Sequence, residues 1–237
     1  MAKNKKRISI VFATDVVGYS RLMSENEDRT LTLLKQARDF IDQTISDYGG
    51  RIANTAGDSV IAVFESATQG LLCSIKIQKT INKNNASFKP DKKLLFRIGL
   101  HMGEITSIGR DVLGGGVNIA ARLEAQAEPG AILMSEALWN FVDQEEVSDP
   151  VALRGELTLK NIDKPVVCYE VLTRRAEKEG ALASEKQSLQ EAKQKVTLVV
   201  KALLGVALGL GLSFMLAYNL TNAMRFSADP ASIVVKE

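Results

Sequence analysis

The sequence has few of the residues that carry much common catalytic and structural chemistry. Its 237 residues include one histidine, His101, and two cysteines, Cys73 and Cys168. No metal-ligand spacing surrounds them, so a zinc centre is excluded and both cysteines are predicted to be buried reduced thiols. His101 stands in a strand-like apolar run and is predicted to be a core residue. Any chemistry must then be carried by carboxylates, Lys, Arg and Asn.

The chain also has little net charge. The chain has 30 Lys and Arg residues and 28 Asp and Glu residues, which gives a formal net charge of +2. The chain lacks the excess of positive charge that is typical of nucleic-acid-binding proteins, so we expect no nucleic-acid partner. The apolar run at residues 8–13 is too short for a secretory leader, and Asp15 closes it. We therefore expect the N-terminal domain to stay in the cytoplasm.

Hydrophobic periodicity predicts alternating strands and helices over residues 1–173. The predicted strands are residues 7–14, 51–54, 59–64, 94–102, 104–108, 131–134, a segment near 157, and 166–172. One predicted helix begins after a capping box at Ser24 and ends near Gly49. The other predicted helices cover residues 67–81, 117–127 and 135–142. This order predicts an α+β fold with a ferredoxin-like or palm-like βαββαβ core, additional strands and helices, and a mostly antiparallel sheet.

The composition changes after residue 173. Residues 174–195 are rich in Glu, Lys, Gln and Ala and are predicted to form a charged helical connector. Residues 196–218 are apolar with one charge, long enough for a single transmembrane helix, and Gly205 and Gly209 form a GxxxG pair suited to helix contact. Lysines dominate the preceding flank. The positive-inside rule then predicts an inner-membrane protein with a cytoplasmic catalytic domain and a short outer tail, residues 219–237.

Two aspartates stand where strands end. Asp15 directly follows the first apolar strand, and Asp58 lies in a Gly-Asp turn between two later strands. If the predicted order is right, both lie at one edge of the sheet. Two converging carboxylates there are suited to a pair of Mg²⁺ ions, which keep several waters and bind phosphate oxygens.

A second group of polar residues begins a helix after three glycines. Asn118 and Arg122 are four residues apart and share one helix face. Arg offers a fork of donors to phosphate oxygens, and Asn offers a smaller donor and acceptor. The glycines at residues 114–116 let a ligand approach the backbone at the helix start. The lysine ending of a P-loop is absent, so that class is excluded.

Several motifs together resemble the class III adenylyl and guanylyl cyclases, especially the bacterial members. The matching segments are residues 12–20 (FATDVVGYS), 57–59 (GDS), 116–122 (GVNIAAR) and 159–165 (LKNIDKP). The resemblance implies that Asp15 and Asp58 bind two Mg²⁺ or Mn²⁺ ions. It also implies that Asn118 and Arg122 stabilise the transition state.

The same resemblance assigns the substrate contacts. Lys160 matches the lysine that holds the terminal phosphates, and Asp111 matches a purine-reading position. Family members form head-to-tail homodimers, in which one subunit supplies the metal aspartates and the other supplies the remaining groups. The chain is thereby predicted to be a membrane-anchored homodimeric adenylate cyclase that converts ATP to 3′,5′-cyclic AMP and pyrophosphate.

One position departs from the family pattern. Asn54 stands where adenylyl cyclases usually have Lys and guanylyl cyclases have Glu. An amide serves either purine, whereas an ionised Asp111 only accepts hydrogen bonds and suits the adenine amine. The alternatives are a guanylyl or mixed-purine cyclase and a catalytically silent cyclase-like regulatory module. A diguanylate cyclase is excluded because the GGDEF signature is absent.

Overall fold

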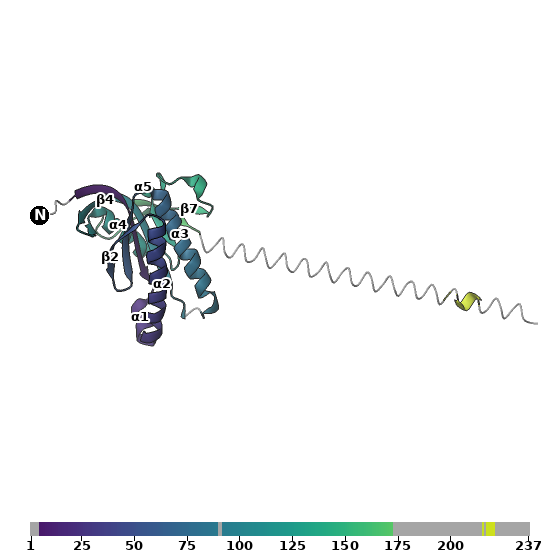
Figure 1. Ribbon diagram of the computed structural model, residues 1–237. Helices are drawn as coiled ribbons and strands as arrows, with labels where there is room; N and C mark the ends of the chain where they lie inside the picture. Colours follow the sequence, from purple (N-terminus) through teal and green to yellow (C-terminus); the bar gives the residue numbers. More distant parts are fainter. Residues whose placement is uncertain (1–4, 90–91, 173–214, 216, 221–237) are drawn as a thin grey trace, which may run out of the picture. The chain divides into compact units, whose positions relative to one another are not determined.

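The computed structural model describes residues 5–89, 92–172, 215 and 217–220 (Figure 1). The chain divides into two units, Met1–Lys178 and Glu179–Glu237, and the first contains all the elements that follow. The strands are β1 (Lys5–Val16), β2 (Arg51–Ala56), β3 (Ser59–Phe64), β4 (Phe96–Ile108), β5 (Asp111–Leu113), β6 (Ile132–Ser135), β7 (Val151–Leu157) and β8 (Val166–Val171). The helices are α1 (Tyr19–Glu25), α2 (Glu27–Asp47), α3 (Ala67–Asn84), α4 (Gly115–Gln126) and α5 (Glu136–Trp139), with 3₁₀ turns at Asn85–Ser87 and Gln144–Glu146.

The strands form one mixed sheet. Its order is β2-β3-β1-β4-β6-β8-β7, and β5 pairs with β4 beside this path. Within the described sheet, only β4 and β6 run parallel; the other pairs are antiparallel. The predicted α+β class and mostly antiparallel sheet are therefore confirmed.

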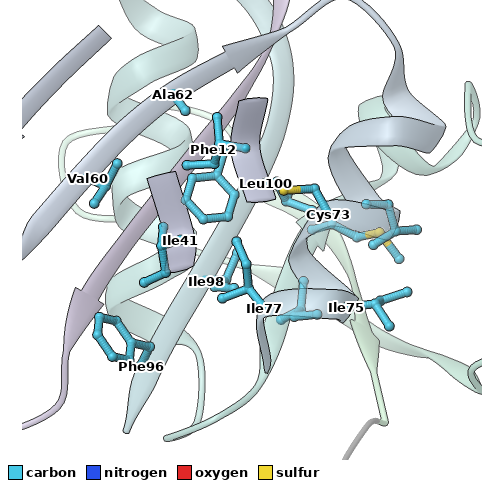
Figure 2. Packing of buried hydrophobic residues seen from close by; sticks show 14 of the residues in the cluster. Phe12, Ile41, Val60, Ala62, Cys73, Ile75, Ile77, Phe96, Ile98 and Leu100 are labelled. Atoms are coloured by element: carbon cyan, nitrogen blue, oxygen red, sulfur yellow. The ribbon is translucent and has the colours of Figure 1, made fainter. Parts of the chain in front are cut away.

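The two faces of the sheet carry different layers. Along β1, Ile10 and Phe12 point into the main core beneath α2 and α3, and Val11 and Ala13 point into a second cluster that contains Ala120 of α4. The alternation of side chains in a strand accounts for this split. Figure 2 shows Phe12 in the main core among side chains from β3, β4 and the helices. Asp15 continues the Val11 and Ala13 side, so it faces the α4 layer.

Two details of the sequence prediction are wrong. The break predicted at Gly103 does not occur, because β4 continues through this residue and pairs it with Ser9 of β1. The cap of α2 is Asn26, whose side chain accepts a hydrogen bond from the Arg29 N–H at 2.9 Å. Ser24 instead lies in α1 and donates to the Ser20 carbonyl at 2.9 Å. The helix does end at the predicted place, beside Gly49 with φ of 72°.

The predicted membrane span lies almost wholly outside the described residues. Of residues 196–218, the structure describes only 215, 217 and 218. Among the residues that are described, no helix combines the length and apolar character needed to cross a membrane. The connector at residues 174–195 and most of the tail also lie outside the described part.

Candidate active site

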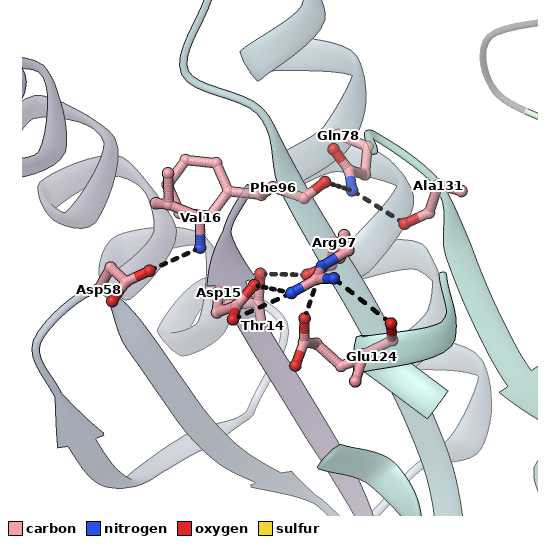
Figure 3. Close-up of polar contacts among 10 residues, drawn as sticks. Thr14, Asp15, Val16, Asp58, Gln78, Phe96, Arg97, Glu124 and Ala131 are labelled. Carbon is pink, nitrogen blue, oxygen red and sulfur yellow. Dashed lines mark hydrogen bonds and ion pairs between the residues drawn. The ribbon is translucent and has the colours of Figure 1, made fainter. Parts of the chain in front are cut away.

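The structure brings Asp15 and Asp58 to one edge of the sheet. Asp15 is the penultimate residue of β1, and Asp58 lies in the turn that joins β2 to β3. The Asp58 Oδ2 atom accepts a hydrogen bond from the backbone N–H of Val16 at 3.0 Å, as Figure 3 shows. This bond fixes the turn against the end of β1, so the two carboxylates come from neighbouring backbone positions.

Asp15 is paired with an arginine that the sequence did not single out. Arg97 is its cross-strand neighbour in β4, and Arg97 Nη2 lies 3.0 and 3.2 Å from the two Asp15 oxygens. The Nε atom of the same arginine lies 2.9 Å from Oε1 of Glu124 on α4. Figure 3 shows the contacts from Arg97 to both carboxylates.

Glu124 is a buried carboxyl group on the side of α4 that faces the sheet. It shares that side with Ala120 and Leu123, which are fully buried. Burial, and then the neighbouring Asp15 carboxylate, raise the pKa of Glu124 to about 8, while Arg97 acts in the opposite direction. A charge within an apolar helix stripe was the available sequence signal for this residue.

A glycine sets the distance between α4 and the sheet. A Cβ atom on Gly99 would lie 2.2 Å from the Ala120 carbonyl oxygen and 2.3 Å from the Glu124 nitrogen. Only glycine fits where the two backbones approach so closely. This contact places Glu124 beside the β4 residue Arg97, two positions from Gly99.

Asn118 and Arg122 lie on the opposite side of α4. Both are exposed, whereas Ala120, Leu123 and Glu124 are buried against the sheet. In the described part of the chain, neither side chain has a hydrogen bond or an ion pair. Their spacing of four residues keeps them on one face, free to meet a ligand.

The loop between β7 and β8 brings Lys160 to the same helix. Leu159 is buried in a cluster with Leu123 of α4, and Ile162 packs against that cluster. The Ile162 N–H donates to the Leu159 carbonyl at 3.1 Å, which closes the turn. Lys160 stands between these two anchors with an exposed side chain.

Asn54 and Asp111 contact each other directly. Asn54 Nδ2 lies 3.2 Å from both Asp111 oxygens, so β2 and β5 are joined at the predicted purine positions. Asp111 also accepts from the Val112 N–H at 2.7 Å. Sequence reasoning missed β5 because three residues give too short a pattern to read. This short strand leads through Gly114 into α4.

The predicted site residues thus form two groups. The carboxylate group is Asp15 and Asp58. The nucleotide group is Asn54, Asp111, Asn118, Arg122 and Lys160. Across the residues that the structure describes, no hydrogen bond or ion pair joins the two groups; Asn118 and Arg122 lie on the side of α4 that faces away from Asp15.

The carboxylate group has suitable chemistry for a hard divalent cation. Magnesium prefers oxygen ligands and usually takes one or two carboxylates with water and substrate phosphates. In the described ranges, no cluster of three or more His, Cys, Asp and Glu side chains is placed to hold a metal. The two aspartates therefore fit an ion whose remaining ligands are water and phosphate oxygens.

His101 has a structural role. Its Nδ1 atom lies 2.7 Å from the Ser135 hydroxyl, and its side chain is buried. Burial lowers the pKa of His101 to about 4. The histidine is neutral at physiological pH and belongs to the core, as predicted.

Comparison with known proteins identifies the fold and the family. The model of the adenylate and guanylate cyclase catalytic domain matches residues 1–173. A crystal structure of an adenylate/guanylate cyclase/hydrolase from Silicibacter pomeroyi superposes with a TM-score of 0.67 at 35% identity, covering 71% of this chain and 98% of that one. The adenylyl cyclase CyaB from P. aeruginosa shares the fold, with a TM-score of 0.62 at 23% identity over 72% and 96% of the two chains.

Curated relatives agree with this assignment. Putative adenylate cyclase 3 of Rhizobium meliloti is 34% identical over 169 residues, which are 70% of this chain and 29% of that protein. An adenylate cyclase of Streptomyces coelicolor is 29% identical over 133 residues, 56% of this chain and 33% of its own length. The chain spans a third or less of the length of these two relatives. It carries a nucleotide cyclase catalytic domain and belongs to the adenylate and guanylate cyclase family.

Proposed function

We propose that the chain is an adenylate cyclase, which converts ATP to 3′,5′-cyclic AMP and pyrophosphate. The observation that carries the proposal is the separation of two strand-edge carboxylates, Asp15 and Asp58, from an exposed Asn118 and Arg122 on the far side of α4. One group suits metal ions and the other suits a triphosphate. Both are needed to turn a ribose hydroxyl into a phosphodiester.

The residues divide the work of a single displacement. Arg122 donates to the α-phosphate oxygens as negative charge grows there, and Asn118 orients the ribose. Lys160 binds the terminal phosphates, which leave as pyrophosphate. The 3′-oxygen forms a bond to the α-phosphorus, the bond to the bridging oxygen breaks, and the hydroxyl proton passes to solvent. Asp15 and Asp58 would hold the divalent ions, which would supply Lewis acidity at the reacting oxygens when bound.

The purine contacts favour ATP. The Asn54 amide contacts both oxygens of Asp111, and it orients that carboxylate as an acceptor. An acceptor suits the exocyclic amine of adenine and opposes the carbonyl oxygen of guanine. Asn54 in place of the lysine common in adenylyl cyclases favours a second candidate, a guanylyl or mixed-purine cyclase.

A homodimer completes the proposed site. Asn118 and Arg122 project away from the side of α4 that carries Glu124 and faces Asp15 of β1. A second copy in head-to-tail orientation would set its nucleotide group against the carboxylate group of the first. Two equivalent sites then form at one isologous interface.

Membrane attachment is part of the proposal and rests on sequence alone. Residues 196–218 contain one charged residue, and lysines precede them. This pattern supports an inner-membrane anchor with the catalytic domain in the cytoplasm. Recovery of the full chain in the membrane pellet after alkaline carbonate washing is expected, whereas release into the supernatant would contradict the anchor.

The test is a product assay on the purified full chain. ATP and GTP are incubated separately with Mg²⁺ and with Mn²⁺, and the products are resolved by mass spectrometry. Cyclic AMP from ATP is the expected result. Cyclic GMP as the main product would refute the adenylate cyclase proposal in favour of the second candidate, a guanylyl or mixed-purine cyclase. No cyclic product from a folded dimer would refute both and leave a silent regulatory module.

A further inference from the structure

Arg97 binds two carboxylates that belong to different elements. Its Nη2 atom contacts both oxygens of Asp15 at 3.0 and 3.2 Å, and its Nε atom lies 2.9 Å from Glu124 Oε1. Its Nη1 atom donates to the Ala125 carbonyl at 3.3 Å, within the last turn of α4. Two of the three anchors are therefore on α4, and the third is a proposed metal ligand.

A divalent cation would compete with Arg97 for the same oxygens. Both oxygens of Asp15 already face the guanidinium, and two cations on one carboxylate repel each other. Metal binding must then weaken or break the contact between Arg97 and Asp15. The side chains of both residues are about three-quarters buried, with 25% and 26% exposure, so a released guanidinium needs another partner.

Glu124 is placed to be that partner. Its side chain is only 11% exposed, and it contacts the Nε atom of Arg97, whereas Asp15 contacts Nη2. Within the described residues, neither Glu124 Oε1 nor Arg97 Nε has a hydrogen-bond partner, so their contact is an ion pair without hydrogen-bond geometry. A small movement of Arg97 towards α4 would convert this ion pair into a hydrogen-bonded one.

We propose that Arg97 is hydrogen-bonded to the Asp15 carboxylate in the metal-free chain, and that the contact with Glu124 holds Arg97 in place when a divalent cation binds Asp15. Glu124 is then a positioning residue that sets metal affinity through Arg97. The inference rests on the proposed function, because it requires Asp15 to be a metal ligand. It gives the two partners opposite effects: Arg97 opposes metal binding, and Glu124 promotes it.

The test measures Mn²⁺ binding to the full chain without nucleotide, from the electron paramagnetic resonance signal of free Mn²⁺. Arg97→Gln is expected to bind Mn²⁺ about tenfold more tightly, and Glu124→Gln about tenfold more weakly, as second-sphere changes commonly do. In the Arg97→Gln background, the added Glu124→Gln change is expected to weaken binding by less than about threefold, because its main route is gone.

Controls separate the inference from the proposed function. Arg154→Gln breaks a comparable pair, Arg154 with Glu170 at 3.0 Å, and should leave Mn²⁺ binding unchanged. Asp15→Asn should abolish the site; equal binding by Asp15→Asn and the unchanged chain would refute the metal assignment itself. If Glu124→Gln does not fold, Glu124→Asp keeps the carboxyl group, shortens its reach to Arg97, and should weaken binding in the same direction.

Two outcomes would overturn the inference while the metal site stands. Unchanged or weaker Mn²⁺ binding by Arg97→Gln would show that Arg97 does not compete for Asp15. Equal weakening by Glu124→Gln with and without Arg97 would make Glu124 a metal ligand instead of a positioning residue.

Discussion

The two sides of α4 hold their charged groups in different ways. Towards the sheet, Glu124 is buried and paired with Arg97, which also binds Asp15. Away from the sheet, Asn118 and Arg122 are exposed and, among described residues, unpaired. The first side is organised by the chain's own contacts, and the second is available to a ligand. The difference supports the proposal that one chain carries two halves of a site.

The largest expected effect comes from removing a carboxylate on the organised side. Asp58→Ala should reduce turnover by at least about 1,000-fold, since it removes a ligand worth several kcal/mol of transition-state stabilisation. Asp58→Asn keeps an acceptor for the Val16 N–H, so it separates charge from structure. Cyclisation assays on both variants check this. Near-normal activity of Asp58→Asn would make the role of Asp58 structural.

The exposed side should be important for catalysis but not for stability. Arg122→Ala is expected to lower kcat by about 100- to 1,000-fold, the usual effect of losing one transition-state donor. Its unfolding free energy should change by less than about 0.5 kcal/mol, because the side chain is exposed and unpaired. Gln126→Ala, one turn further along α4, is the control with unchanged turnover. A large loss of stability in Arg122→Ala would contradict the comparison.

The opposite result is expected where α4 contacts the sheet. Gly99→Ala should destabilise the fold by about 1–3 kcal/mol or more, because its Cβ would meet backbone atoms of α4 that cannot rotate away. Gly115→Ala is the control, since its Cβ would meet nothing within 4 Å. Urea unfolding of both variants gives the difference. Equal stability of the two would mean that the α4 contact is looser than described.

A smaller effect is expected from His101, which lies beside Gly103 under the start of α4. The folded pKa is about 4, below the ordinary value of 6.5, so the unfolded chain binds more protons between these values. Stability from this group is complete above pH 6.5 and is lost as the pH falls towards 4, by roughly 1 kcal/mol per pH unit. Urea midpoints at pH 7 and 5 should differ less in His101→Gln than in the unchanged chain; equal differences would contradict the shift.

The sequence predicted the elements and the motif residues better than their contacts. Apolar alternation was enough to locate β1, because strands buried on both faces read as continuous apolar runs. It could not predict that Gly103 continues β4, since a glycine in a strand pattern more often marks a break. Arg97 and Glu124 were missed because their importance depends on a cross-strand register and on a helix packed at Gly99. Both the register and the packing are features of tertiary structure, which local sequence patterns do not determine.

We propose that each chain carries two half-sites that are completed by another copy. The most direct test is to co-express differently tagged Asp15→Ala and Arg122→Ala chains and to purify the mixed dimers through both tags. Each variant alone should be inactive. Mixed dimers keep one intact site of two, so the doubly purified sample should recover about half of normal activity. Recovery of cyclic AMP synthesis would support the account. Inactive mixed dimers, with both chains shown to be present and folded, would contradict it.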